Sequence, residues 1–568
     1  MYKSSRTNGN IMRSIFLIIT LIMSLPFNFI VAKELPSSEG ILLKDYHNKS
    51  NTKLVLGEKI HNPYSVENMQ KAASNLSLKL AISATHLYIK FMPTTAEQLD
   101  ILESDSSLIL YDHPLDNKIA KDGDYYHDPE IPESQPTYQY ASVKKGQLLP
   151  TGVNFEILSE LYIPDENYAN KNNKEIIEID SLVDEALYIS GNLPSANQAT
   201  LRRGRWRPTG KIRVWDNSLG EHSYIISKTF DHWDYSDCFH DKTNPKDEPD
   251  DEWACRKAAY VTVMGTKRGS YIPLEGVRVR ARRYFTTYTG LTDANGHFSL
   301  NGRFRGGARY SIKWQRHDFN IKSSYWWVAK HNGPLKIGDW NWDISGGLNQ
   351  YYSAILRAAN HYFYENIKGL SRPSRWYVRK LNIRAYESFR SDLRGNFVID
   401  LNQIAIRMYG RPSMKTYKTT IHEIAHLSHS LMDISAYTLL TLTPSGKRVQ
   451  ESWAKGVSWV LTKMVYDILN TGQRIERNNS NYTDYTGVVV DMMDEFTPVV
   501  TNENTNDVHN GGFNNLLFDS VEGYTIKQIE DALYLTVSWD QWRARLESFN
   551  DNPTEDNLVT LFDAWSGD

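Results

Sequence analysis

Apolar and polar positions follow three different patterns along the chain, and the first is a mixture of short elements. From about residue 33 to 200, short apolar segments are separated by sequence rich in Asn, Ser, Asp and Pro. The pattern predicts a strand at Leu87–Phe91, a helix at Ala96–Glu103 and another strand at Leu108–Tyr111. This order of strand, helix and strand is typical of a small α+β module.

The second pattern, from about residue 206 to 325, is an alternation of apolar and polar side chains over short runs that end at turn residues. Alternation with a period of two predicts strands with one buried face. The expected strands are Lys211–Trp215, Ala259–Met264, Gly276–Arg283, Phe298–Leu300 and Tyr310–Trp314. The middle of the chain is therefore expected to be all-β.

The third pattern, from about residue 339 to 568, is mainly the 3.6-residue period of amphipathic helices. The expected elements are a Tyr-rich helix at Leu348–Asn366, strands at Leu381–Ala385 and Asn396–Ile406, a helix within Ser413–Leu442, and a helical run from Glu451 to Ile468. Together the three patterns predict a multidomain chain that ends in a mainly α domain.

The helix expected after Ser413 contains the sequence TTIHEIAH, in which His422 and His426 are one helical turn apart and Glu423 follows the first histidine. Positions i and i+4 share one face of a helix, about 6 Å apart along its axis, so two imidazoles can bind one Zn²⁺ at about 2.0–2.1 Å. The glutamate can reach a water on the metal. Apolar neighbours favour burial of this helix with its histidines facing a cleft. The HExxH pattern predicts a zinc hydrolase site, with a chance occurrence as the alternative.

The third ligand decides which class of zinc site this is. His429 lies on the same helix face, but its axial distance of about 10 Å from His422 is too long for three imidazoles to converge without a chain break. The metzincin pattern HExxHxxGxxH needs Gly and His where this chain has His429 and Met432. Glu451, which opens the next helical run, is the next candidate ligand. The alternative is a simple first-turn glutamate, which the helix dipole favours.

These segments resemble the gluzincin class of zinc peptidases, in which HExxH is followed by a ligand glutamate on another helix. The segment Gln450–Ala454 is similar to the Asn-Glu-Gly-Phe-Ala type of third-ligand segment in that class. Ser428, where metallopeptidases usually carry an apolar residue, departs from the pattern, and no Gly-x-Met-Glu-Asn segment of the aminopeptidase branch precedes the motif. The resemblance implies that His422, His426 and Glu451 bind Zn²⁺ and that Glu423 is the catalytic base. It also implies that the substrate is a protein or peptide.

In such a site three protein ligands leave one metal position open for water, whose pKa falls to about 7. Glu423 would accept a proton from this water and pass it to the leaving amine. A hydrogen-bond donor for the oxyanion is also expected, and His509 and Tyr485 are the candidates, with an ordinary loop position as the alternative for each. Asp491 and Asp494 could orient an imidazole or could be solvated helix acids.

The stretch from Pro273 to Phe298 resembles the carboxypeptidase regulatory-like, transthyretin-like β-sandwich. The similarity rests on the sequence PLEGVRV, on the Thr-rich segment Thr286–Thr292 and on the sequence DANGHF that follows. In that family the Thr-Asp-x-x-Gly-x-Phe segment is a hairpin turn, in which Asn-Gly supplies positive φ. The resemblance implies a sandwich over residues 206–325 that serves as a spacer or a binding surface.

Composition sets the expected compartment. An apolar run at Ile15–Met23, preceded by arginine and ending near Ala32, predicts a signal peptide over residues 1–32. No later stretch is long and apolar enough to span a bilayer, so the mature chain is expected to be secreted, periplasmic or on the cell surface. Cys238 and Cys255, the two cysteines, are then expected to form one disulfide, worth about 3 kcal/mol.

The net charge of −3 gives no indication of nucleic-acid binding. A local basic cluster precedes the middle stretch and consists of Arg202, Arg203, Arg205 and Arg207. Without a nucleic-acid module, this cluster favours a linker with a processing site over a polyanion surface. The module at 33–200 is then either a propeptide that blocks the cleft and is removed near this cluster, or an accessory domain.

Two other functions stay open. A secreted binding or adhesion protein could carry an inactive metalloprotease-like domain, although a degenerate site usually loses one of the residues His422, Glu423 and His426, which are all present. A metal-dependent hydrolase of non-peptide substrates would share the same motif. The sequence therefore predicts a secreted zinc metallopeptidase, with its catalytic domain at residues 339–568, and leaves these two alternatives to experiment.

Overall fold

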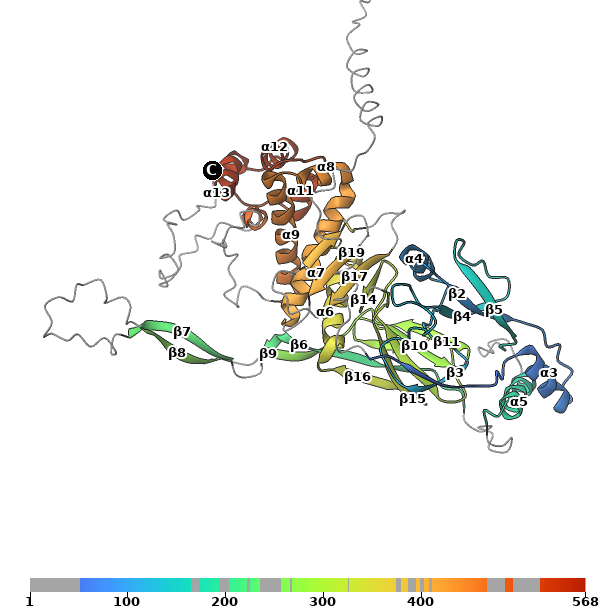
Figure 1. The fold of residues 1–568 in the computed structure, drawn as a ribbon. Helices are drawn as coiled ribbons and strands as arrows, with labels where there is room; N and C mark the ends of the chain where they lie inside the picture. The colour runs from blue at the N-terminus through green and yellow to red at the C-terminus, as the bar shows by residue number, and fades with distance from the viewer. Residues whose placement is uncertain are drawn as a thin grey trace, which may run out of the picture. The chain divides into compact units, whose positions relative to one another are not determined.

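The computed structural model describes residues 52–164, 173–193, 204–221, 225–234, 257–265, 268–324, 326–373, 380–386, 395–398, 403–407, 411–466, 486–493 and 521–566. Over these residues the fold is mixed α/β, with several sheets and a helical C-terminal region (Figure 1). The expected signal peptide at residues 1–32 and both cysteines, Cys238 and Cys255, lie outside the described residues. None of the described helices is long and apolar enough to cross a membrane.

The N-terminal part combines two small sheets with helices. Its elements are β1 (Val55–Lys59), α3 (Val66–Asn75), β2 (His86–Met92), α4 (Ala96–Ser104), β3 (Asn117–Lys121), β4 (Gln139–Lys144), β5 (Asn154–Leu161) and α5 (Asn173–Ile189). The antiparallel sheet has the order β4-β2-β5, and β1 pairs with β3. Strand β2 and helix α4 confirm two of the expected elements. The expected strand at Leu108–Tyr111 is wrong: Tyr111 makes an isolated bridge to Tyr140, and the carbonyl of Leu110 accepts a hydrogen bond from Arg280 instead.

The middle part contains two four-stranded sheets. The first has the order β11-β10-β13-β15, and the second has the order β12-β6-β16 with β9 paired to β6. Their strands are β6 (Thr209–Glu221), β9 (Arg268–Pro273), β10 (Arg278–Arg283), β11 (Thr286–Leu291), β12 (His297–Ser299), β13 (Ala308–Lys313), β15 (Lys330–Lys336) and β16 (Trp340–Ile344). A separate antiparallel pair is formed by β7 (Ile225–Asp234) and β8 (Lys257–Gly265). The expected strands of this part therefore all exist, and β15 and β16, which follow residue 325, complete the two sheets.

The segment between β11 and β12 is a tight turn, but it does not form a hairpin. Gly296 has a φ of +75°, and a Cβ at this position would lie 2.3 Å from the carbonyl oxygen of Ile212, so glycine is required for two reasons. The Asp293 carboxylate accepts hydrogen bonds from the backbone N–H groups of Asn295 and His297, both at 2.9 Å. However, β11 pairs with β10 and β12 pairs with β6, so the turn carries the chain from one sheet to the other.

A third sheet precedes and supports the C-terminal helices. It has the order β14-β17-β19-β18, in which the first three strands are parallel and the edge strand is antiparallel. Its strands are β14 (Phe319–Lys322), β17 (Leu381–Tyr386), β18 (Gly395–Val398) and β19 (Gln403–Arg407). The single strand expected at Asn396–Ile406 is therefore two strands that pair with each other, because the chain reverses between them.

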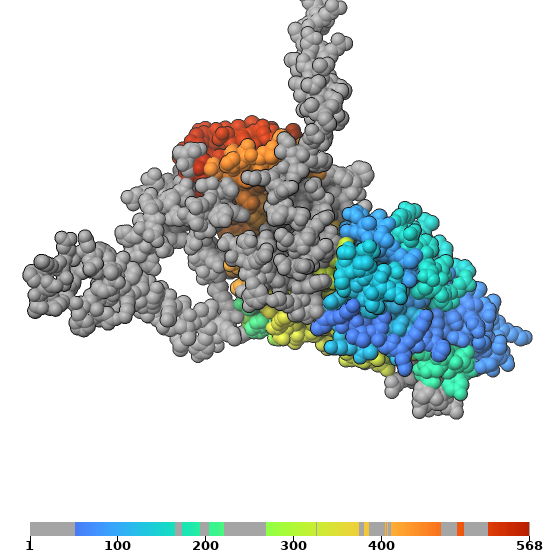
Figure 2. All heavy atoms as spheres, in the orientation of Figure 1, coloured from blue at the N-terminus to red at the C-terminus, as the bar shows by residue number. Residues whose placement is uncertain are grey.

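The C-terminal helices begin with α6 (Gly347–Tyr364), as expected, and continue as a group (Figures 1 and 2). The others are α7 (Ser413–Met432), α8 (Ile434–Leu440), α9 (Pro444–Val465), α10 (Val488–Asp491), α11 (Ile526–Asp531), α12 (Trp539–Phe549), η6 (Glu555–Asn557) and α13 (Leu558–Ser566). One hydrophobic core connects these helices with the third sheet and with both middle sheets, and it includes the fully buried Trp314, Trp453 and Trp542. The helices are therefore held by a core that begins far upstream in the chain.

Candidate metal centre

The helix that carries HExxH, α7, begins at a position fixed by a distant strand. Pro412 is its N-cap and offers no capping side chain. Instead, the Ser413 N–H donates to Oδ1 of Asn217 at 2.8 Å, and the Met414 N–H donates to Oγ of Ser218 at 3.1 Å. These donors are among the backbone N–H groups that every helix start leaves unsatisfied. Strand β6 therefore caps the motif helix across almost two hundred residues of sequence.

The second helix of the site, α9, is set by its own local sequence. Thr443 caps it by accepting a hydrogen bond from the Gly446 N–H, and proline occupies its first position. A Cβ on Gly446 would lie 2.2 Å from the carbonyl oxygen of Leu440, so glycine allows the close turn between α8 and α9. Glu451 lies two turns inside α9 and not in its first turn. The alternative reading of Glu451 as a helix-start acid is therefore wrong.

Three side-chain atoms from these two helices converge on one point. Nε2 of His422 lies 3.1 Å from Oε2 of Glu451 and 3.2 Å from Nε2 of His426, and the His426 to Glu451 distance is 3.4 Å. Two ligands on a tetrahedral metal with bonds of about 2.0–2.1 Å are about 3.3–3.4 Å apart. The triangle therefore has the size that a tetrahedral ion needs, and the group formed by these three residues could hold a metal ion.

The three residues differ in burial, which leaves one side of the group accessible. The side chain of His426 is 7% exposed, whereas those of His422 and Glu451 are 16% and 25% exposed. Burial by itself would raise the pKa of Glu451, but the two imidazoles beside it hold that pKa well below the usual value of a glutamate. An ionised carboxylate beside two imidazoles is the donor set that favours a divalent transition metal.

Glu423, the motif glutamate, is buried next to the triangle but is not part of it. Burial raises the pKa of its carboxyl to about 7, an effect to which Glu451 adds and which His422 opposes. Such a carboxyl can exchange a proton near neutral pH, which is the property required of a general base.

Tyr437 on α8 is a residue of the centre that no sequence motif predicts. Its hydroxyl lies 3.2 Å from Nδ1 of His426, and its ring meets the ring of His429 edge to face, with 4.9 Å between centroids. Its backbone carbonyl accepts a hydrogen bond from Gln450, the neighbour of Glu451. If Nε2 of His426 binds the metal, Nδ1 carries the proton and donates to the tyrosine oxygen, which fixes the orientation of the ring. His429 itself is buried and is not one of the three converging donors, as its distance along the helix predicts, and it does not lie on the surface.

The remaining candidates divide into described and undescribed residues. Asp491 accepts a hydrogen bond from Nε1 of Trp565 at 2.6 Å. His509, Tyr485 and Asp494 lie outside the described residues. In the basic cluster, Arg205 forms an ion pair with Asp180 of α5, and Arg207 donates to the carbonyl of Leu300. These two arginines therefore hold the chain together at this point, while Arg202 and Arg203 are not described.

A buried ion pair connects strand β6 to the helices of the centre. The Asp216 carboxylate is paired with Arg357 of α6 and accepts a hydrogen bond at 2.7 Å from the hydroxyl of Tyr466, the C-cap of α9. Arg357 also donates to the same hydroxyl at 3.1 Å. Asp216 is 1% exposed, and its neighbours along β6 are the two residues that cap α7. One end of one strand therefore positions α6, α7 and α9.

Acid is expected to loosen the contact between α6 and α7 at His361, which hydrogen-bonds Tyr417. Burial, together with Arg357, lowers the pKa of His361 from 6.5 to about 4. Between pH 4 and pH 6.5 the unfolded chain therefore binds more protons at His361 than the folded chain does. The contribution of His361 to the free energy of unfolding is complete above pH 6.5 and is lost as the pH falls toward 4. The total loss is about 3 kcal/mol. Urea unfolding at pH 7 and at pH 4.5 measures this loss, and His361→Gln should lose less stability between the two pH values than the unchanged chain does. The exposed His317→Gln should behave like the unchanged chain, and equal acid losses in all three would contradict the assignment.

Comparison with known proteins gives no relative: no family model, no curated protein and no solved structure matches the chain. The function of the chain is therefore inferred from the geometry of the site.

Proposed function

We propose that the chain is a zinc metallopeptidase of gluzincin type. The observation that carries the proposal is the triangle of His422, His426 and Glu451, whose edges of 3.1–3.4 Å match the ligand spacing of a tetrahedral ion. Two imidazoles and a carboxylate suit zinc, and the accessible side at His422 and Glu451 leaves room for a fourth ligand. When bound, zinc would lower the pKa of water and polarise a peptide carbonyl.

The residues of the chain then take distinct roles in the proposed reaction. Glu423 accepts a proton at its carboxylate and returns it to the amine that leaves, a role that its raised pKa supports. Tyr437 holds the ring of His426, and burial of the helices around the site limits access of bulk water. Strand β18 is the edge of the third sheet and packs against α7, so an extended peptide could add to it as a further strand. A strand at the sheet edge beside the site favours an extended peptide as the substrate over a small compact molecule.

The rest of the chain has a place in the same proposal. We propose that residues 1–32 direct export, so that the enzyme acts in a secreted, periplasmic or surface location. The two middle sheets share one core and contain the segment that resembles a carboxypeptidase regulatory-like sandwich. The two middle sheets position the candidate metal centre, because residues of β6 cap α7 and Asp216 of β6 forms an ion pair with Arg357 of α6.

Metal content of a Glu451→Ala variant tests the proposal. The unchanged protein should bind one zinc per chain, and the variant should bind it more than about 100-fold more weakly, since loss of even an outer-shell partner costs 10–100-fold. Elemental analysis and competition with a chromogenic chelator measure the change. Glu67→Ala, which alters an exposed glutamate of α3, is the matched control and should bind zinc normally. Equal zinc affinity in all three proteins would contradict the role of Glu451.

A further inference from the structure

A second charged region lies on one face of the first middle sheet, away from the metal centre. Residues two apart on a strand share a face, so β10 places Arg278, Arg280 and Arg282 together. Its partner β13 places Arg309 and Lys313 beside them: Arg278 is directly opposite Lys313, and Arg282 is directly opposite Arg309. Like charges directly opposite each other on neighbouring strands are destabilising. This basic face therefore needs compensation from elsewhere.

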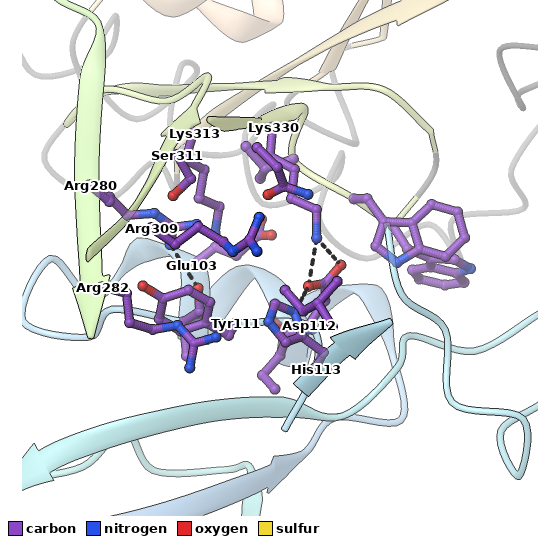
Figure 3. Close-up of a pocket in the computed structure, with 17 residues that line it drawn as sticks. Glu103, Tyr111, Asp112, His113, Arg280, Arg282, Arg309, Ser311, Lys313 and Lys330 are labelled. Atoms are coloured by element: carbon purple, nitrogen blue, oxygen red, sulfur yellow. Dashed lines mark hydrogen bonds and ion pairs between the residues drawn. The ribbon is translucent and has the colours of Figure 1, made fainter. Parts of the chain in front are cut away.

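The N-terminal part covers the basic face and makes specific contacts with it. Arg280 donates to the carbonyl of Leu110, and Arg282 donates to the carbonyl of Leu115, both at 3.1 Å. The ring of Tyr111 lies under both guanidinium groups, at 4.6 Å and 5.0 Å from its centroid. Figure 3 shows Arg280, Arg309, Lys313 and Lys330 of the sheet on one side of a shared space, Asp112 and His113 on the other, and Arg282 beside Tyr111.

The carboxylates in this space are already engaged. Asp112 binds Lys330 at 2.8 Å and also hydrogen-bonds His113 at 2.8 Å. Glu103 binds Lys322 at 2.5 Å and accepts a hydrogen bond from Asn320. Arg309 reaches Asp122 at the surface.

Three cations of the space have no carboxylate partner among the described residues, namely Arg280, Arg282 and Lys313. Nε2 of His113 and Nε of Arg280, which line the space, are buried and make no hydrogen bond with the described residues. Burial lowers the pKa of Lys313 to about 7 and that of His113 to about 4, so the surroundings disfavour these positive charges. Of these three cations Arg280 is buried and Arg282 and Lys313 are partly exposed, and the space lacks the matching negative charge.

The space itself has the size of a small ion. Its volume is about 50 Å³. One water occupies roughly 10–15 Å³ of such a volume, so the space takes about four oxygen-sized atoms. Four oxygens are the complement of a tetrahedral oxyanion, and guanidinium groups bind such oxygens in a geometrically specific way.

We propose that the cavity between the basic face of β10 and β13 and the segment Leu110–His113 binds a free tetrahedral oxyanion of the sulfate or phosphate type. Lys313, Arg280 and Arg282 supply the positive charge. Because the sheet and the N-terminal part each form one wall of the cavity, the bound anion would join them and strengthen their contact. The site is independent of the metal centre and does not rest on the proposed peptidase activity.

Anion-dependent thermal stability of the full chain tests this site. Sodium sulfate, titrated to about 10 mM against sodium chloride of equal ionic strength, should raise Tm by about 2–5 °C with saturation. Lys313→Met should abolish the sulfate-dependent rise. It should not lower Tm in chloride, because it removes a partly desolvated charge that has no carboxylate partner among the described residues. Lys336→Met changes an exposed lysine of the neighbouring strand β15 and should keep the full rise.

The outcomes separate a specific site from a general salt effect. Equal responses of the unchanged protein and Lys313→Met, or an equal response to chloride, would overturn the proposal. Isothermal titration with inorganic phosphate should give one site per chain in the unchanged protein and in Lys336→Met. Glycerol 3-phosphate tests the size of the ligand: binding as tight as that of phosphate, or tighter, would show that the ligand extends beyond the cavity and would overturn the assignment to a free ion.

Discussion

On the proposed peptidase function, replacement of Glu423 by glutamine is expected to abolish peptide hydrolysis and to leave zinc binding unchanged. The substitution preserves size and removes the group that would accept and return the proton. General base catalysis of this kind contributes about 10²–10⁴-fold, so kcat/KM should fall by at least that factor. Glu423 is not one of the three converging donors, so zinc binding should persist. Turnover of a proteome-derived peptide library, with zinc content measured on the same samples, gives both quantities.

The buried position of Glu423 makes this variant informative. With a pKa raised to about 7, the carboxyl is partly neutral at neutral pH, and a neutral amide of the same shape should fit the same space. Glu67→Gln, at an exposed helix position, serves as the control for handling and folding. Full turnover by Glu423→Gln would rule out the proposed mechanism, whereas absence of turnover in the unchanged, zinc-loaded protein would favour the binding-protein alternative. A chelator should stop hydrolysis in the unchanged protein.

Asp216→Asn is expected to cause the largest loss of stability, about 3–5 kcal/mol in the free energy of unfolding. Asp216 is almost fully buried, and its removal as an anion leaves Arg357 in the core without its charge partner. Asparagine has one acceptor oxygen in place of two, so either the hydroxyl of Tyr466 or the backbone N–H of Ser218 would also lose its acceptor. Because the neighbouring residues of β6 cap α7, the unfolding of this junction should also disturb the helices of the metal centre. Urea unfolding followed by circular dichroism measures the loss.

The second middle sheet offers a matched control for this ion pair. Arg213 of the same strand makes a two-pronged contact with Asp343 of β16, with distances of 2.8 Å and 2.6 Å, but both side chains are more than 40% exposed. An exposed pair of this kind contributes about 0–1 kcal/mol, so Asp343→Asn should be nearly neutral. If the two variants lose equal stability, burial does not explain the importance of Asp216. If Asp216→Asn is neutral, the junction is held by the hydrophobic core alone.

Local sequence determined much of the candidate site. The spacing of His422 and His426 follows from helical geometry, and the absence of Pro and Gly around them allows one continuous helix, as observed in α7. Glu451 could be selected as the third partner because it lies on a separate helix with apolar periodicity. The helix at α6 and most strands were predictable for the same reason, since hydrophobic period depends only on neighbouring residues.

Only the tertiary structure revealed the contacts between residues that are distant in the chain. The capping of α7 by Asn217 and Ser218 and the contact of Tyr437 with His426 leave no local pattern, because each joins segments that become neighbours only after folding. The same holds for the turn at Gly296, where a hairpin sequence connects two different sheets, and for the cations of β10 and β13, whose excess over nearby carboxylates appears only in the packed structure. Sequence alone thus determined which residues could bind a metal, through the helical repeat. The fold determined whether they meet, through packing between elements that the chain keeps far apart.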